Sequence, residues 1–346
     1  MRAAERKAGL VPQLTGGCCL AEAKRDCDSS GGFCGKASDM LRSSRKAAGV
    51  SKSVRYPGRC AWVFIFLLVG AASPARAWGD RAHRMVNAAA IENLPEPLRS
   101  YFRSSIAYLI DHASEPDLLA RDNPEEKPHH YTEIDAADAY PFLAFQEAFV
   151  SKRLAPTAAE RRHGDSVWQI ERFALLMARA MRQGRWGEVE HAAVFAAHYA
   201  CDLTQPLHTV ANYDGELTNQ TGIHARFETE LVNALADRWA FQPRPPTDEP
   251  DLRARIFREL LESHSFCVPL LAADRIAAAG RTYQDPRYFP EFAKLAGPIA
   301  RRRLEAGISF VSSLWYTAWV RAGRPDLSKG KIRRRRELSP RPLRLH

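Results

Sequence analysis

The chain has 346 residues, of which 45% are hydrophobic, and a formal net charge of +10. Its length suits one large domain or two small ones with a substantial core, but the positive charge lies at the ends: residues 1–77 and 321–346 each carry +8, and residues 78–320 carry −6. An acidic central part argues against a general polyanion-binding protein, unless bound cations reverse its local field.

The first 77 residues are predicted to be an extension that ends in a secretion signal. Residues 61–72 are an apolar run, preceded by lysines and arginines and followed by Ala75-Arg-Ala77. This order is typical of a secretory signal, and the run is too short to span a bilayer comfortably. We therefore expect cleavage after Ala77, a secreted or periplasmic protein, and no membrane span in the mature chain. A retained N-terminal anchor is the alternative.

Cleavage after Ala77 makes Trp78 the first residue of the mature protein, with His83 close behind it. A free α-amino group has a pKa near about 8, so it can bind a metal once it is deprotonated. Together with its own carbonyl oxygen it forms a chelate. The alternative is that Trp78 is simply the first aromatic residue of the core.

The central region shows repeated helical periodicity and no β-hairpin or phosphate-loop signature. The expected helices span 82–93, 96–111, 139–151, 165–183, 187–204, 222–241, 251–279 and 288–320. The polar, proline-containing segment 112–135 is expected to be an ordered loop over a site, and the proline-rich segment 242–250 a connection.

These elements predict a single all-α domain over residues 78–322. The Arg-rich, apolar-poor segment 323–346 is predicted to be a disordered tail. Five of the seven cysteines precede residue 78, and only Cys201 and Cys267 follow it. This distribution excludes a disulfide framework in the domain, while pairing of these two cysteines remains an open alternative.

The most informative motif is His198-Tyr-Ala-Cys-Asp202-Leu-Thr-Gln-Pro-Leu-His208. His198 and Asp202 stand four residues apart, so on a helix they share one face and can bind one ion or two neighbouring ions. Pro206 should end that helix, which places His208 just beyond it. His224 and Glu228 repeat the same spacing. Imidazole together with carboxylate is a ligand set that suits zinc.

Further candidate ligands lie in the segment 112–135, in Glu115-Pro-Asp117 and in His129-His130-Tyr131. We favour His130 over its neighbour His129, because His130 directly precedes the aromatic residue. With the two helical pairs, this inventory of histidines and carboxylates suits more than one metal ion.

The order of these motifs resembles one superfamily, which comprises the fungal single-strand-specific nucleases and the bacterial zinc-dependent phospholipases C. The resemblance covers residues 78 to about 230, and its most specific parts are the stretch from Asp202 to His208 and the start at Trp78. It implies the single-domain, multi-helix fold of these enzymes and a cluster of three zinc ions.

The resemblance also assigns ligands to each ion. The first ion is expected to bind Asp117, His130, His198 and Asp202. The second is expected to bind His208, His224 and Glu228. The third is expected to bind the amino nitrogen and carbonyl oxygen of Trp78, with His83 and Asp202. Asp202 would then bridge the first and third ions, which a carboxylate can do and an imidazole cannot.

The expected chemistry is hydrolysis of a phosphodiester by zinc-activated water. Asp117 is the candidate that orients the water, and Arg121, four residues later, is the candidate that contacts a phosphate oxygen; a plain surface role for Arg121 is the alternative. The leading interpretation is a single-strand nuclease or 3′-nucleotidase acting on single-stranded nucleic acid.

Two other functions remain open from the sequence. A phospholipase C acting on a phospholipid head group is favoured by Glu228, where the nucleases typically have Asp, and by the absence of an aromatic residue just before Asp117. The amino-acid sequence of the segment from Asp202 to His208 favours the nucleases. A helical module that binds zinc without turnover is disfavoured, because structural zinc sites are usually closed by four ligands and rich in cysteine.

Overall fold

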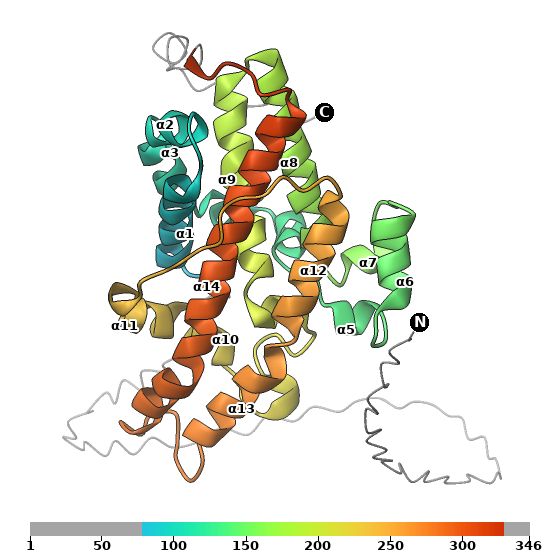
Figure 1. The fold of residues 1–346 in the computed structure, drawn as a ribbon. Coiled ribbons are helices and arrows are strands. Elements are labelled where there is room, and N and C mark those ends of the chain that lie inside the picture. Colours follow the sequence, from blue (N-terminus) through green and yellow to red (C-terminus); the bar gives the residue numbers. More distant parts are fainter. Residues whose placement is uncertain (1–77, 329–346) are drawn as a thin grey trace, which may run out of the picture. The chain divides into compact units, whose positions relative to one another are not determined.

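The longest helix, α14 (Tyr288–Arg321), runs through the length of the computed structural model, which describes residues 78–328 (Figure 1). It packs against α1, α8, α9 and α13. The predicted leader, residues 1–77, lies outside the described residues, as do residues 329–346 of the predicted tail. Residues 323–328 of that segment are described, and Leu327 is buried, while the disorder of the tail stays a prediction.

Helices form the whole architecture, and residues 78–328 contain no strand, which confirms the predicted all-α class. The α-helices are α1 (Asp80–Asn93), α2 (Leu98–Arg103), α3 (Ile106–Asp111), α4 (Glu115–Asp122), α5 (Ile134–Ala137), α6 (Leu143–Gln146), α7 (Ala158–Arg161), α8 (Ser166–Gln183), α9 (Trp186–Leu203), α10 (Ile223–Ala225), α11 (Val232–Leu235), α12 (Leu252–His264), α13 (Cys267–Ala277) and α14. Short 3₁₀ segments are η1 (Pro124–His130), η3 (Pro206–Thr209), η4 (Glu216–Thr218) and η6 (Ala236–Arg238), and π segments are η2 (Glu147–Ser151) and η5 (Arg226–Leu231).

The segment 112–135 is not the loop that its prolines suggest, because it contains α4 and η1. Pro116 occupies the first turn of α4, where its missing N–H has no intrahelical partner to lose. The Asn123 side chain then accepts a hydrogen bond from the Glu125 N–H at the start of η1. The expected helix 222–241 is also different, since it is a succession of α10, η5, α11 and η6.

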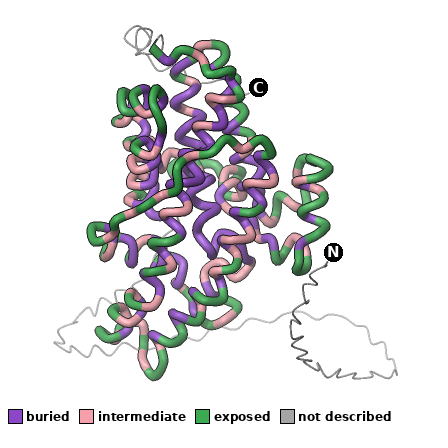
Figure 2. The backbone as a smooth tube through the Cα atoms, in the orientation of Figure 1, coloured by how far each residue is buried: buried purple, intermediate pink, exposed green. Residues whose placement is uncertain are grey.

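The antiparallel neighbours α8 and α9 form the centre of the protein. In α8, Val167, Ile170 and Phe173 recur at helical spacing and are buried, and Gly184 ends the helix with φ +65° in the left-handed region. In α9 most side chains are buried, and its many alanines let other helices approach closely. Figure 2 shows this central region buried. The histidine and aspartate of the main motif therefore sit in the core.

A buried arginine of α14 holds the end of α9. Arg303 is fully buried, and its Nε–H donates to the Thr204 carbonyl, at 3.1 Å, two residues after Asp202. Its Nη2–H donates to Ser263 Oγ at 2.8 Å and to the Glu259 carboxylate. A cation at a helix C-terminus is favourable, and a buried charge needs such a carboxylate partner. The last helix thus fixes the chain where the metal-ligand motif leaves α9.

The connection between α11 and α12 lies extended along α14. Backbone N–H groups of this segment donate to side-chain oxygens of α14 in four pairs: Gln242 to Glu305, Arg244 to Ser309, Thr247 to Ser313, and Glu249 to Thr317, at 2.9–3.2 Å. The acceptors recur every four residues, so they lie on one face of the helix. Among the described residues, no helix is long and apolar enough to cross a membrane.

Candidate metal centre

His198 and Asp202 form the centre of the first side-chain cluster. Both are fully buried on α9, and their spacing brings His198 Nε2 to 3.3 Å from Asp202 Oδ2. His198 Nδ1 donates to the Ala113 carbonyl at 2.9 Å, which turns Nε2 toward the carboxylates. A histidine whose second nitrogen is held in this way is oriented as metal-ligating histidines are.

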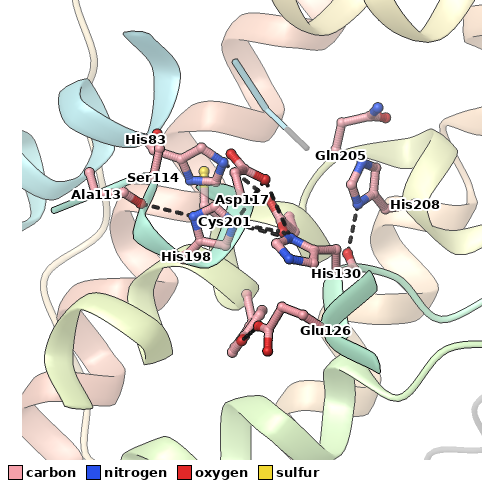
Figure 3. Close-up of polar contacts among 12 residues, drawn as sticks. His83, Ala113, Ser114, Asp117, Glu126, His130, His198, Cys201, Gln205 and His208 are labelled. Carbon is pink, nitrogen blue, oxygen red and sulfur yellow. Dashed lines mark hydrogen bonds and ion pairs between the residues drawn. The ribbon is translucent and has the colours of Figure 1, made fainter. Parts of the chain in front are cut away.

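The segment 112–135, which contains α4 and η1, supplies two more groups to this first cluster. Asp117, in the first turn of α4, has Oδ1 3.5 Å from His198 Nε2. His130, at the end of η1, has Nδ1 3.0 Å from Asp202 Oδ2 and 3.1 Å from His198 Nε2. His129 is not part of the cluster, because its Nδ1 pairs with Asp165 Oδ1 at 2.6 Å. Figure 3 shows Asp117, His130 and His198 converging.

His83 completes the first cluster from α1. Its ring lies beside that of His198 (Figure 3), and the two rings stack with centroids 4.0 Å apart. Its Nε2 lies 3.2 Å from Asp202 Oδ1. The two oxygens of Asp202 therefore face different partners: Oδ1 faces His83, and Oδ2 faces His130 and His198. This is the arrangement that a bridging carboxylate requires.

The charges of the first cluster stabilise one another. Burial raises the pKa of Asp202, but His198, His130 and His83 outweigh burial and hold it well below its usual range. Burial lowers the pKa of His198, and the carboxylates of Asp202 and Asp117 outweigh burial and raise it to about 9. In His83 burial dominates, so its pKa is lowered and the neutral form is favoured. A neutral imidazole is the form that binds metals.

A second cluster consists of His208, His224 and Glu228, all fully or almost fully buried. His208 Nδ1 donates to the His130 carbonyl at 2.7 Å, which links the two clusters. Its Nε2 then lies 2.9 Å from His224 Nε2, and Glu228 Oε2 lies 3.3 Å from the same nitrogen of His224. Two ring nitrogens at this distance need a proton or a cation between them.

The electrostatics of the second cluster also fit a bound cation. Burial raises the pKa of Glu228 well above its usual value, and the charge of Asp117 adds to this. Burial and His208 lower the pKa of His224 well below its usual value. Both groups are thus pushed toward their neutral forms. A divalent cation would favour the ionised carboxylate and the neutral imidazole together.

Unpartnered polar atoms mark where such ions would sit. Both ring nitrogens of His83, Nε2 of His130 and Oδ1 of Asp202 are buried and make no hydrogen bond of good geometry. Buried polar groups are normally satisfied, so these atoms need another partner. Three groups of described residues could hold a metal ion: His83 with Asp117 and His198, His130 with His198 and Asp202, and His208 with His224 and Glu228. Nitrogen and oxygen donors of this kind suit zinc.

Two predicted site residues, Trp78 and Arg121, are not among these histidine and carboxylate side chains. Trp78 is fully buried, and its ring packs against Phe227, 5.4 Å away between centroids and next to Glu228 in the chain. Ligation by its amino group stays a prediction, as does cleavage after Ala77, which is outside the described residues. Arg121 is exposed on α4, one turn beyond Asp117, and its catalytic role also stays a prediction. Cys201 and Cys267 are both free and buried.

Sequence reasoning missed the groups that support the second cluster. Asp214 accepts hydrogen bonds from the Gly222 and His224 N–H groups, at 2.9 and 3.1 Å. Tyr213 packs on His224 with ring centroids 4.0 Å apart, and Gln205 Nε2 lies 3.5 Å from Glu228 Oε2. The N-cap of α10 is Gly222, not Asp214, so the local capping signals of the sequence do not identify Asp214.

In sequence comparison, no protein-family model and no curated protein matches the chain. The two clusters are therefore the features of the chain from which a function can be inferred.

Proposed function

We propose that the chain is a secreted zinc-dependent phosphodiester hydrolase with three zinc ions and the fold of the single-strand-specific nucleases and zinc-dependent phospholipases C. The observation that carries the proposal is the shared carboxylate of Asp202, which faces His83 through one oxygen and His130 and His198 through the other. Asp117, His130, His198 and Asp202 would hold the first ion. His208, His224 and Glu228 would hold the second. Trp78, His83 and Asp202 would hold the third.

Catalysis is favoured over structural zinc binding by the ligand count. The second cluster offers three protein ligands, and a structural site usually has four that are rich in cysteine. Both cysteines of the described residues are buried free thiols that belong to neither cluster. Zinc supplies Lewis acidity, which activates water near neutral pH and neutralises charge on a phosphoryl group.

The protein's own groups have separate roles in this proposal. Asp117, whose Oδ1 lies 3.5 Å from His198 Nε2 and 3.6 Å from His130 Nδ1, would accept a hydrogen bond from the attacking water and so orient it. Arg121, which is exposed on α4, would contact a phosphate oxygen of the substrate. The burial of both clusters keeps their charges in a medium of low polarity, where they act more strongly than in water.

Single-stranded nucleic acid is the substrate that we favour. Tyr213 packs on both histidines of the second cluster, with centroids 4.0 Å from His224 and 5.8 Å from His208, and it is only partly buried. An aromatic ring beside the metals is what a nuclease needs to stack a base. A phospholipase C is the second candidate, because Leu118 and Leu119, directly after Asp117, are 51% and 43% exposed.

The decisive experiment measures metal content and hydrolysis together. The purified protein should contain three zinc ions per chain by elemental analysis and should cleave denatured DNA in a manner that a chelator abolishes and zinc restores. Phosphatidylcholine vesicles are the parallel substrate, and faster turnover of the vesicles would assign a phospholipase C. A protein with bound zinc but no chelator-sensitive cleavage of either substrate would be a binding module, and the proposed enzyme would be wrong.

A further inference from the structure

A buried ion pair lies directly behind the second cluster. Arg226 stands between His224 and Glu228 in the chain, and its guanidinium pairs with groups of α13 and α14. Its Nη2 lies 3.1 Å from Oδ1 of Asp274, a fully buried residue of α13. Its Nε–H donates to the Tyr288 hydroxyl at 2.9 Å. Arg226 itself is 8% exposed, so both charges of this pair are largely out of water.

The surroundings of the pair satisfy nearly all of its hydrogen-bonding groups. Asp274 also accepts from Gln220 Nε2 at 2.7 Å, from the Tyr283 hydroxyl at 3.2 Å and from the Tyr288 hydroxyl. The guanidinium carbon of Arg226 lies 3.8 Å from the centroid of the Tyr283 ring, which is a cation–π contact. Removing one partner of such a pair leaves an uncompensated buried charge, so its geometry is strongly specified.

Arg226 also pins the loop that leads into the second cluster. Its Nη1–H and Nη2–H donate to the carbonyls of Thr221 and Gln220, at 2.9 and 3.0 Å. Gly222 follows with φ +87°, and a Cβ there would lie 2.7 Å from Arg226 Nη1. The Asp214 carboxylate holds the N–H groups of Gly222 and His224 from the other side. The short loop that leads to His224 is therefore held by two side chains: Arg226 binds its carbonyl groups, and Asp214 binds its N–H groups.

The helical turn that carries Glu228 is of the wide π type. The segment η5 begins at Arg226, and π segments are rare and are frequently found at functional sites. In this turn Glu228 Oε2 comes to 3.3 Å from His224 Nε2, the position that a shared ion requires. Arg226, the cation of the pair, is the first residue of the π segment. Its contacts with α13 and with the first residue of α14 stabilise that irregular turn.

We propose that the Arg226–Asp274 pair, with Tyr283 and Tyr288, is the positioning device of the second cluster. Without the pair, the loop 214–222 and the π turn relax, and His224 and Glu228 no longer meet at one point. This inference rests on the proposed function in one respect, namely that the second cluster binds a metal ion. Supporting groups of this kind typically change metal affinity by about 10- to 100-fold when they are lost.

The test titrates the metal-free full chain with Co²⁺ and follows the visible absorption of each bound ion. Asp274→Asn should weaken one binding step by about 10- to 100-fold and leave the others unchanged. Tyr288→Phe, which removes one donor and keeps the ring, should weaken the same step by a smaller factor. In a Glu228→Gln background, where the second cluster is already impaired, Asp274→Asn should have no further effect on Co²⁺ binding.

The matched control is Glu171→Gln, which removes the carboxylate partner of another largely buried arginine, Arg253, whose Nη2 lies 2.7 Å from Glu171. It should leave every Co²⁺ affinity unchanged. Equal losses in Asp274→Asn and Glu171→Gln, unchanged affinities in Asp274→Asn, or an additive loss in the Glu228→Gln background would each overturn the inference. If Asp274→Asn does not fold, an unchanged affinity in Tyr288→Phe overturns it. A wild-type chain that binds no Co²⁺ would refute the proposed function itself.

Discussion

Asp202 and His83 are joined through the oxygen that the α9 histidine does not use: His83 Nε2 lies 3.2 Å from Oδ1, while His198 Nε2 lies 3.3 Å from Oδ2. Because His83 and His198 also stack at 4.0 Å, their ring nitrogens approach one carboxylate from two sides. A single side chain thus connects α1, η1 and α9.

Asp202→Asn should therefore reduce the zinc content by more than one ion per chain. An amide keeps the shape of the side chain but removes the negative charge and one acceptor oxygen. Elemental analysis of the purified variant gives the stoichiometry. Asp165→Asn is the control, because Asp165 is an equally buried carboxylate that pairs with His129 outside the clusters. Loss of one ion or none in Asp202→Asn would argue against a bridge.

Extension of the mature N-terminus by one residue before Trp78 should remove one zinc ion. The chelating amine would become an amide nitrogen, which does not bind zinc at neutral pH. His83→Ala should lose the same ion, so the two variants should have equal zinc contents, and the combined variant should lose no more. An extended protein with the wild-type metal content would show that the amino group is not a ligand.

The sequence is sufficient to predict contacts between residues that a helix places on one face. The spacing of His198 and Asp202 on α9 predicts their contact, because neighbours on a regular helix depend only on chain separation. The pair of His224 and Glu228 also meets, although its segment is a π turn rather than the predicted α-helix. The histidine–carboxylate spacing was thus a better guide than the type of helix.

Helical periodicity in the sequence does not predict contacts between segments that are far apart in the chain. Nothing in the local pattern places His83 of α1 on the ring of His198, since that contact depends on how α1 packs against α9. The prolines of segment 112–135 favour a loop, but Pro116 lies in the first turn of α4, and a proline in that position also indicates a helix start. That helix carries Asp117 into the cluster.

Removal of zinc with a chelator should lower the melting temperature substantially. A ligand at a thousand times its Kd stabilises the native state by about 4 kcal/mol per site. For a domain of this size each kcal/mol corresponds to about 2–4 °C, so even one site should contribute about 8 °C or more. Calorimetry with and without chelator measures this. A triple variant of His208, His224 and Glu228 should show a smaller chelator effect, and an equal effect would contradict ion binding there.

Arg121→Ala should lower kcat/KM for denatured DNA by about 100-fold, the usual cost of losing one group that stabilises transition-state charge. The zinc content should not change, because Arg121 is exposed and outside both clusters. Arg179→Ala on the exposed face of α8 is the control for loss of a surface positive charge. Equal activities of the two variants would assign Arg121 to the surface alone.

Stability toward acid should depend on Glu259. Burial raises its pKa, but the guanidiniums of Arg303 and Arg255 outweigh burial and hold it below its usual value. A lowered pKa in the folded state contributes stability above the unfolded value of about 4.3, and this contribution is lost as the pH falls through the folded value. Glu259→Gln should cost up to about 3–5 kcal/mol at pH 7, because the buried Arg303 then keeps only the part-exposed carboxylate of Glu262, 3.0 Å from its Nη1.

Chemical denaturation from pH 7 to pH 3 checks this prediction, and the difference between wild type and Glu259→Gln should shrink below about pH 4.3. Glu291→Gln, at a partly exposed carboxylate that pairs with the exposed Lys294, should change stability little at any pH. A difference between wild type and Glu259→Gln that stayed constant over the whole range would mean that the charge of Glu259 does not matter.

The extended segment 242–250 also limits the pairing of this protein with β-strands of other molecules. Four of its N–H groups are taken by oxygens of α14, and Pro243, Pro245, Pro246 and Pro250 have none to offer. A β-strand of a second molecule could not pair regularly with this segment, because its backbone N–H donors are already bonded or are missing at every position except Asp248. A long extended stretch can therefore lie on the surface of this helical protein without becoming a template for intermolecular β-sheet or fibril growth.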